Sequence, residues 1–293
     1  MRYFIVLFLF GISNYLYSQD KPAYKIFTSE GKKARYGDIV KEASGSDFVF
    51  FGELHDNPVA HWLELELTKD LFSIKSKNLV LAAEMFETDN QILIDEYFSG
   101  IIKESSFETE VRKWSNYATD YKPLLNFAKD NGLRFIASNI PRRYASVVSS
   151  GGFEALDKIS PAGKNYVAPL PVEYDPELPC YKDMLSMSGG PMGHASPNLP
   201  KAQAIKDATM AYSITRNWHK DQTVIHFNGS YHSDRHQGIV WYIKKTLPEV
   251  RITTITTVQQ DTVDKMKDEF RGVADFIIVV PSTMTKTFKS AGE

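Results

Sequence analysis

The sequence predicts an α/β fold: a mainly parallel β-sheet flanked by helices, with a smaller helical subdomain inserted between strands. Several short apolar runs are continuously apolar, as is typical of strands covered on both faces. Helical patterns lie between these runs, and that alternation favours parallel pairing. The six predicted strands are Asp47–Phe51, Leu79–Ala83, Arg134–Ser138, Thr223–Phe227, Arg251–Thr256 and Asp275–Val280.

The first eighteen residues have the pattern of a secretory signal peptide. A short positive start precedes an apolar stretch from Tyr3 to Ile12, and the small residue Ser18 follows at a plausible cleavage position. We therefore expect a signal peptide over residues 1–18, a single domain over residues 19–293, and a periplasmic or secreted protein. An uncleaved membrane anchor is the alternative. Cys180 does not follow the apolar stretch, so no lipid-modified cysteine is expected there.

The composition is that of an ordinary globular protein. Of 293 residues, 43% are hydrophobic and 24% are charged, and the formal net charge is −2. The absence of a basic excess argues against nucleic acid as a partner. With Cys180 as its single cysteine, the chain has no internal disulfide framework.

Two long gaps between predicted strands indicate helical insertions at about residues 87–130 and 140–220. The clearest helical patterns in them are Asp89–Phe98, Tyr121–Asp130 and Lys201–Trp218. We expect the insertions to pack together as a smaller cap beside the strand ends. Within the second insertion, Pro176–Pro200 is rich in glycine and proline, which predicts a mobile loop that can act as a lid. Its His194 could touch a metal or haem; a plain flexible surface loop is the alternative.

The first predicted strand ends abruptly in Gly52-Glu53-Leu54-His55. A helix over Pro58–Phe72 should follow, with Asp56 or Asn57 as N-cap and Pro58 at the first helical position. In parallel sheets, ligands bind beyond the carboxyl ends of the strands. Glu53 and His55 therefore stand where chemistry is expected.

The fourth predicted strand ends in a second Gly-x-x-His, Gly229-Ser230-Tyr231-His232. Glycine lets the backbone leave the sheet tightly, and the histidine follows three residues later. Two facing imidazoles can bind a divalent metal or share acid and base duties. Glu84 ends the second strand at the same level. A Glu53, His55, Glu84 and His232 cluster would suit Zn²⁺ or Mn²⁺, with one carboxylate left as general base.

Other polar residues lie near the same rim. Arg142 and Arg143 follow the third strand and could meet propionate or phosphate groups, although a solvated helix start is equally consistent. Arg235 could orient a ligand or simply pair with Asp234. His226, inside an apolar strand, is interpreted as a core residue.

Several motifs together resemble the ChaN-like haem-binding proteins. This family of exported bacterial proteins is linked to iron uptake and lies within an EreA/ChaN/Tiki-like superfamily that includes Tiki-type metalloproteases and erythromycin esterases. The motifs are GELHDNP with His61, LAAEMF, SNIPRR, AQAIKDATMA and NGSYHSDRHQGIVWYI. The resemblance implies an α/β core with a helical subdomain, haem binding in the ChaN branch, and metal-assisted or His/Glu hydrolysis in the wider group.

Carried over by motif, the catalytic positions of the wider group are His55, Glu84 and His232, with Glu53 adjacent. The resemblance also implies a tyrosine as haem ligand, for which Tyr144, beside the two arginines, is the candidate. We therefore expect an exported haem-binding protein for haem or iron acquisition. Its expected partners are haem, a second copy of the chain and the haem-uptake machinery of the outer membrane.

The alternative function is a hydrolase of peptides or esters that uses the paired Gly-x-x-His motifs, with Mn²⁺, Co²⁺ or Zn²⁺ as its metal. A third possibility is a catalytically silent binding protein that keeps the polar strand ends for stability. The sequence leaves open whether the chain is an enzyme.

Overall fold

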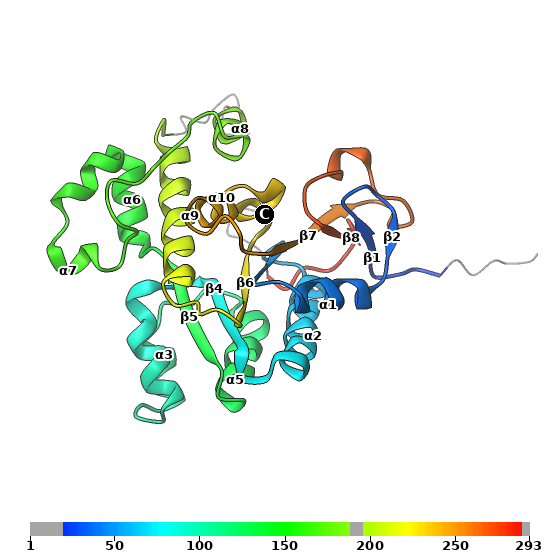
Figure 1. Cartoon of the computed structure of the whole chain (residues 1–293), viewed down its shortest axis with the longest axis horizontal. Coiled ribbons are helices and arrows are strands. Elements are labelled where there is room, and N and C mark those ends of the chain that lie inside the picture. The colour runs from blue at the N-terminus through cyan, green and yellow to red at the C-terminus, as the bar shows by residue number, and fades with distance from the viewer. Residues whose placement is uncertain (1–19, 188–195, 289–293) are drawn as a thin grey trace, which may run out of the picture.

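The structure is a computed structural model that describes residues 20–187 and 196–288 (Figure 1). The predicted signal peptide over residues 1–18 and the candidate ligand His194 lie outside these ranges. Within them, no helix combines the length and the apolar character that crossing a membrane requires.

The described residues form one mixed sheet in the order β2-β1-β8-β7-β3-β6-β4-β5. The strands from β8 to β5 in this order pair in parallel, whereas β1 is antiparallel to both β2 and β8. In chain order the strands are β1 (Lys25–Thr28), β2 (Lys33–Ala34), β3 (Phe48–Glu53), β4 (Leu79–Glu87), β5 (Arg134–Asn139), β6 (Thr223–Gly229), β7 (Ile252–Gln260) and β8 (Phe276–Pro281).

All six predicted strands are present, and the predicted α/β fold with a mainly parallel sheet is confirmed. The sequence prediction missed the β1–β2 hairpin, which adds an antiparallel edge to the sheet. These strands are too short to give an alternating pattern, and β1 is fixed by pairing with the distant strand β8.

Ten α-helices lie in the described residues, with short 3₁₀ and π turns between some of them. They are α1 (Tyr36–Ser44), α2 (Pro58–Lys75), α3 (Gln91–Phe98), α4 (Glu104–Glu110), α5 (Lys122–Asp130), α6 (Arg142–Gly151), α7 (Pro161–Lys164), α8 (Pro179–Met187), α9 (Leu199–Thr215) and α10 (Ile239–Thr246).

Helices cover both faces of the sheet, and alternate residues of each strand meet different helices. On β3, Val49 and Phe51 belong to the core that includes α2 and α5, whereas Phe48 and Phe50 pack in the core of α9 and α10. This is the two-residue period of a strand buried on both sides. Burying each phenylalanine contributes about 1.5–3 kcal/mol. Strand β3 is thus held rigidly, and so is the polar segment that follows it.

The two helical insertions do not form one shared cap. Helix α5 completes the core of α1 and α2, whereas α9 lies across the opposite face of the sheet (Figure 1). Helix α6 with the turns after it builds one separate cluster against α9, and α8 builds a second. The insertions touch through the Arg143–Asp89 ion pair of 2.6 Å and a 2.8 Å hydrogen bond from Thr88 to the Tyr166 carbonyl. A parallel sheet must cover two apolar faces, and each face recruits an insertion helix.

The predicted lid loop Pro176–Pro200 begins with a helix instead, because α8 occupies Pro179–Met187. Tyr181 on this helix is fully buried and donates a 2.8 Å hydrogen bond to Asp207 on α9. Tertiary packing therefore overrides the loop-like composition in this part of the segment. The glycines of the segment, at 189, 190 and 193, lie outside the described residues.

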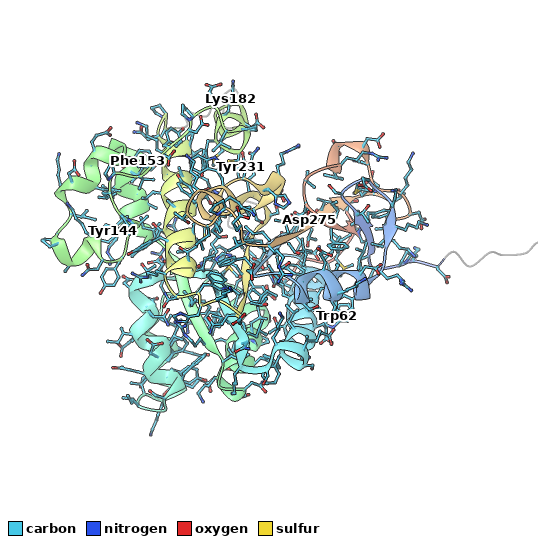
Figure 2. All side chains as sticks on the ribbon, viewed as in Figure 1. Trp62, Tyr144, Phe153, Lys182, Tyr231 and Asp275 are labelled. Atoms are coloured by element: carbon cyan, nitrogen blue, oxygen red, sulfur yellow. The ribbon has the colours of Figure 1, made fainter. Side chains whose placement is uncertain are left out.

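Helix α2 starts as predicted, with Pro58 at its first position and Asn57 rather than Asp56 as N-cap. The Asn57 side chain accepts hydrogen bonds from the backbone N–H groups of Val59 and Ala60 at 3.0 and 3.1 Å. Trp62 on this helix is 52% exposed (Figure 2). The charged residue Glu64 occupies the buried face of this helix, where it is fully enclosed.

Candidate functional site

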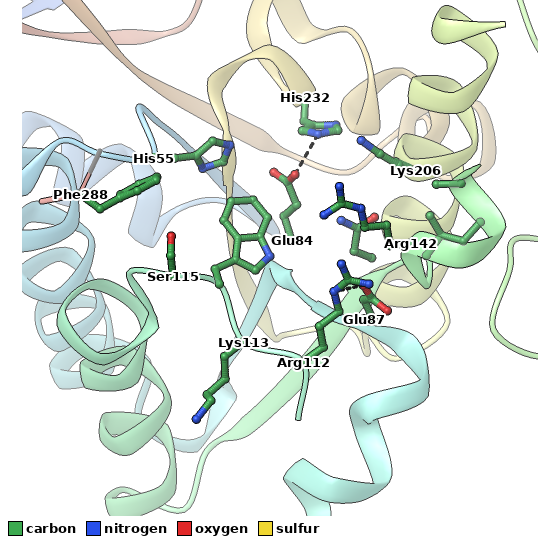
Figure 3. A pocket seen from close by; sticks show the side chains of 14 residues that line it. His55, Glu84, Glu87, Arg112, Lys113, Ser115, Arg142, Lys206, His232 and Phe288 are labelled. Carbon is green, nitrogen blue, oxygen red and sulfur yellow. Dashed lines mark ion pairs between the residues drawn. The ribbon is translucent and has the colours of Figure 1, made fainter. Parts of the chain in front are cut away.

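The two Gly-x-x-His segments lie side by side at the carboxyl edge of the sheet. Strands β3 and β6 are adjacent, and Glu53 is in register with Gly229. Strand β4 borders β6 on its other side. His55, Glu84 and His232 consequently line one cavity of about 650 Å³ (Figure 3).

His232 is buried between two carboxylates. Its Nδ1 donates to Asp207 at 2.5 Å, and its Nε2 lies 3.2 Å from a Glu84 oxygen. Burial alone would lower the pKa of His232, but Glu84 and Asp207 raise it to about 10. Burial opposes ionisation of Glu84, yet His232 and a 2.8 Å hydrogen bond from the Gly229 N–H bring its pKa down to about 2. At neutral pH His232 and Glu84 are therefore both ionised, whereas burial raises the pKa of Asp207 above its usual range.

His55 has a more open environment. Its Nδ1 lies 2.5 Å from Glu53 Oε1, and Glu53 also accepts a 2.7 Å hydrogen bond from the Tyr121 hydroxyl. The side chain of His55 is 36% exposed, and the Trp114 ring packs against it with 4.8 Å between centroids. Because a carboxylate can only accept, Nδ1 carries the proton. The Nε2 atom is therefore the nitrogen left for a ligand in the cavity.

The two motif glycines make room for each other's segments. A Cβ on Gly52 would lie 2.9 Å from the Ser230 Cα, and a Cβ on Gly229 would lie 2.7 Å from His55 Nε2. Gly229 has a φ of −54°, which any residue can adopt. The requirement for glycine is thus close approach rather than the backbone freedom that the sequence interpretation invoked.

Cationic side chains surround the rest of the cavity. Arg112, Lys113, Arg142 and Lys206 line it, and Arg112 pairs with Glu87 at 3.3 Å (Figure 3). Among the described residues, Arg142 and Lys206 have no ion-pair partner. The site can therefore accept a ligand that carries negative charge.

The remaining predicted site residues lie elsewhere. Glu53 is enclosed behind His55 rather than on the cavity wall. Arg143 pairs with Asp89 and stacks on the ring of Tyr144, which packs in the cluster that α6 forms with α9 (Figure 2). Arg235 lines a separate cavity of about 500 Å³ and forms no ion pair with Asp234 among the described residues.

His226 is a core residue, as predicted. It is fully buried, with hydrogen-bond contacts of 2.9 Å to both Ser138 and Asn228. Burial lowers its pKa to about 4, so it is neutral at physiological pH.

Sequence reasoning missed several partners of the two histidines. Asp207 fixes His232, and Tyr121 bonds to Glu53. His61 Nε2 contacts the His55 carbonyl at 3.1 Å. Asp207 lies among Ala204, Ile205 and Ala208 on a buried helix, and a carboxylate within such an apolar stretch is a signal that could have been used.

Comparison with known proteins identifies the family. Residues 39–243, more than half of the chain, match the family described as "Haem-binding uptake, Tiki superfamily, ChaN". The protein belongs to this family of haem-binding ChaN proteins.

Known structures share the fold. ChaN of Campylobacter jejuni, described as binding haem cofacially, is 19% identical with a TM-score of 0.65, over 88% of this chain and 96% of that one. A succinoglycan biosynthesis protein is 10% identical with a TM-score of 0.51, over 91% and 96% of the two chains. These likenesses show a common fold.

A sequence relative is the chloroplastic protein RETICULATA-RELATED 5 of Arabidopsis thaliana. The two are 26% identical over an alignment 184 residues long, and the match covers 57% of this chain. The match spans only 24% of that relative.

Proposed function

We propose that this protein is an exported haem-binding protein that serves haem or iron acquisition, and that haem occupies the cavity beside His55. Membership of the haem-binding ChaN family supports the ligand. The signal-peptide pattern over residues 1–18 supports export to the periplasm or the medium. A second copy of the chain and an outer-membrane uptake system are its proposed partners.

The observation that carries this proposal is the combination of His55 with the cations of the cavity. The Nδ1 of His55 is committed to Glu53 at 2.5 Å. Histidines that bind iron characteristically hold their other ring N–H on a carboxylate in this way. A cavity of about 650 Å³ can take a cofactor-sized group. Arg142 and Lys206 are then placed for the propionates.

Hemin titration of the purified chain tests the proposal. We expect a shifted Soret band in the wild type and loss or displacement of that band in His55→Ala. In Arg142→Ala the affinity for hemin should fall at least roughly tenfold, because a charge-assisted hydrogen bond contributes about 1.5–3 kcal/mol. Arg143→Ala is the matched control, since the neighbouring Arg143 pairs with Asp89 outside the cavity. Its affinity should equal that of the wild type.

The same titration shows whether haem binds at all and which residue binds it. A spectrum identical to free hemin with wild-type protein would overturn haem binding altogether. If His55→Ala keeps the wild-type band while Tyr144→Phe loses it, the protein binds haem through Tyr144 and the assignment of His55 is wrong.

A hydrolase is the second candidate function, favoured by the convergence of His55, Glu84 and His232 on one cavity. Both ring nitrogens of His232 are already engaged, by Asp207 and Glu84. This arrangement suits proton transfer through Glu84 better than a metal bound to His232. Peptide and ester substrates, assayed with and without Mn²⁺, Co²⁺ or Zn²⁺, provide the test. Turnover that is lost in His55→Ala supports the hydrolase, and equal rates in the two proteins contradict it.

A further inference from the structure

A second group of polar side chains lies behind the cavity wall, between the end of β3 and the first turns of α2. It consists of Glu53, His61 and Glu64, all buried, with relative exposures of 1%, 6% and 0%. His61 and Glu64 are three residues apart and so share one face of α2. One nitrogen and two carboxylate oxygens of this group lie within 4.8 Å of one another.

The two carboxylates are incompletely satisfied. Glu53 Oε1 is bonded to His55 and Tyr121, whereas Glu53 Oε2 has no hydrogen-bond partner, and neither has Glu64 Oε1. The Nδ1 atom of His61 lies 3.2 Å from Glu53 Oε2 and 3.1 Å from Glu64 Oε2. One N–H cannot satisfy this many acceptors. Leaving buried carboxylate oxygens without a cation or donor costs several kcal/mol.

The other nitrogen of His61 fixes the orientation of its ring. Its Nε2 lies 3.1 Å from the backbone carbonyl of His55 and 3.3 Å from a carboxylate oxygen of Asp120, and since both groups accept, Nε2 carries a proton. In a neutral imidazole the Nδ1 lone pair then faces the two carboxylates. Metal-binding histidines show this arrangement, with the second N–H held by a backbone carbonyl.

We propose that Glu53 Oε2, His61 Nδ1 and Glu64 bind one divalent cation of the Mn²⁺, Fe²⁺ or Zn²⁺ class. One imidazole and two carboxylates are ligands that these borderline ions accept. The two positive charges of the ion balance the two carboxylates that bind it. A third buried carboxylate, that of Asp120, lies 3.3 Å from His61 Nε2 and accepts hydrogen bonds from two other side chains. This site lies behind the haem cavity, whose wall contains neither His61 nor Glu64, and the two sites share Glu53, whose Oε1 is bonded to His55.

The competing account neutralises the same group with protons, one on His61 and one shared by the two carboxylates. Replacement of Glu64 by glutamine separates the two accounts, since glutamine has the shape and hydrogen-bonding capacity of a protonated Glu64 but cannot serve as an anionic ligand. Under the proton account Glu64→Gln is harmless. Under the metal account it removes a ligand.

The experiment measures metal binding by the full chain after chelator treatment. Titration with Co²⁺, followed by its visible absorption, and with Zn²⁺ and Mn²⁺ by calorimetry, should give one ion per wild-type chain and a rise in Tm. Glu64→Gln should bind at least about 100-fold more weakly and lose the Tm rise. Glu66→Gln is the matched control, since Glu66 lies on the same helix in a surface pair with Lys69. It should behave as the wild type.

Three outcomes would overturn the proposal. The first is that the wild type binds no ion, and the second is that Glu64→Gln binds as much metal as the wild type. The third is that metal raises the Tm of neither protein while metal-free Glu64→Gln melts at or above the Tm of the wild type. The wild-type titration decides the question even where the variant fails to fold. Hemin binding by Glu64→Gln should be unchanged, so failure here leaves the proposed haem function untouched.

Discussion

The two Gly-x-x-His segments have the same spacing and end adjacent parallel strands, yet their histidines have different surroundings. His55 has one carboxylate partner, and its side chain is 36% exposed toward the cavity. His232 is 5% exposed and held between Glu84 and Asp207. The comparison teaches that a repeated motif does not imply a repeated role. His55 is placed to meet a ligand, whereas His232 holds the buried charges beneath it.

Removal of each imidazole is the strongest way to test this difference. His232→Ala leaves Glu84 and Asp207 as buried charges without their shared partner, which should cost about 3–5 kcal/mol of unfolding free energy. His55→Ala leaves Glu53 with Tyr121 and His61, so the loss should be about 1 kcal/mol. Denaturant unfolding of both variants measures the two values. Equal losses would mean that both histidines have the same structural role.

Alanine substitutions at the two motif glycines should differ less in their cost to stability than the two histidine substitutions do. In Gly52→Ala the new Cβ meets the backbone of Ser230, which cannot move without disturbing β6, and we expect a loss of about 1–3 kcal/mol. In Gly229→Ala the neighbour is the His55 ring, which can rotate away. That variant should lose less stability but displace His55, and hemin spectra would report the displacement. A Gly229→Ala protein with a wild-type spectrum would contradict the reciprocal packing.

The pH dependence of stability gives a finer comparison of the two histidines. The unfolding free energy changes by about 1.4 kcal/mol per pH unit for each proton that the folded state binds and the unfolded state does not. Both histidines have raised pKa values in the folded protein, that of His232 about 10, despite the opposing effect of burial. The stabilisation that the two protonated histidines provide is therefore complete below their unfolded-state pKa of about 6.5, and it is lost as pH rises through their folded-state pKa values. Unfolding free energies measured from pH 6.5 to 10 should decline, and His232→Gln should flatten the decline. An unchanged slope in His232→Gln would show that His232 is neutral.

The strands and the meeting of the two motifs could be predicted from the sequence. Continuous apolar runs such as Phe48–Phe51 have few alternatives to a strand buried on both sides. Once the strands are parallel, their polar ends meet at one edge, and His55, Glu84 and His232 line a common cavity as a result. Local patterns were sufficient here because the sheet geometry supplies the long-range information.

The partners of these residues could not be predicted, since they come from helices whose rotation depends on packing. Asp207 and Glu64 are buried on α9 and α2, and their spacing alone does not show which core they enter. Arg143 and Tyr144 follow Arg142 directly in the sequence, but the helical turn directs Arg143 to Asp89 instead. Helix α8 is joined to α9 by the hydrogen bond from Tyr181 to Asp207, a contact between segments that local composition does not reveal.

The pairing of β3 with β6 also has a consequence for how the protein folds. The Glu53–Gly229 register joins positions separated by more than half of the chain, with β4 and β5 between them in sequence. Closing so long a loop has a high cost in chain entropy, and because of this cost such contacts form late in folding. Partly folded chains will therefore contain both motifs without the cavity between them. Ligand binding at His55 would report completion of the sheet, and ligand present during refolding should favour the native state only after that step.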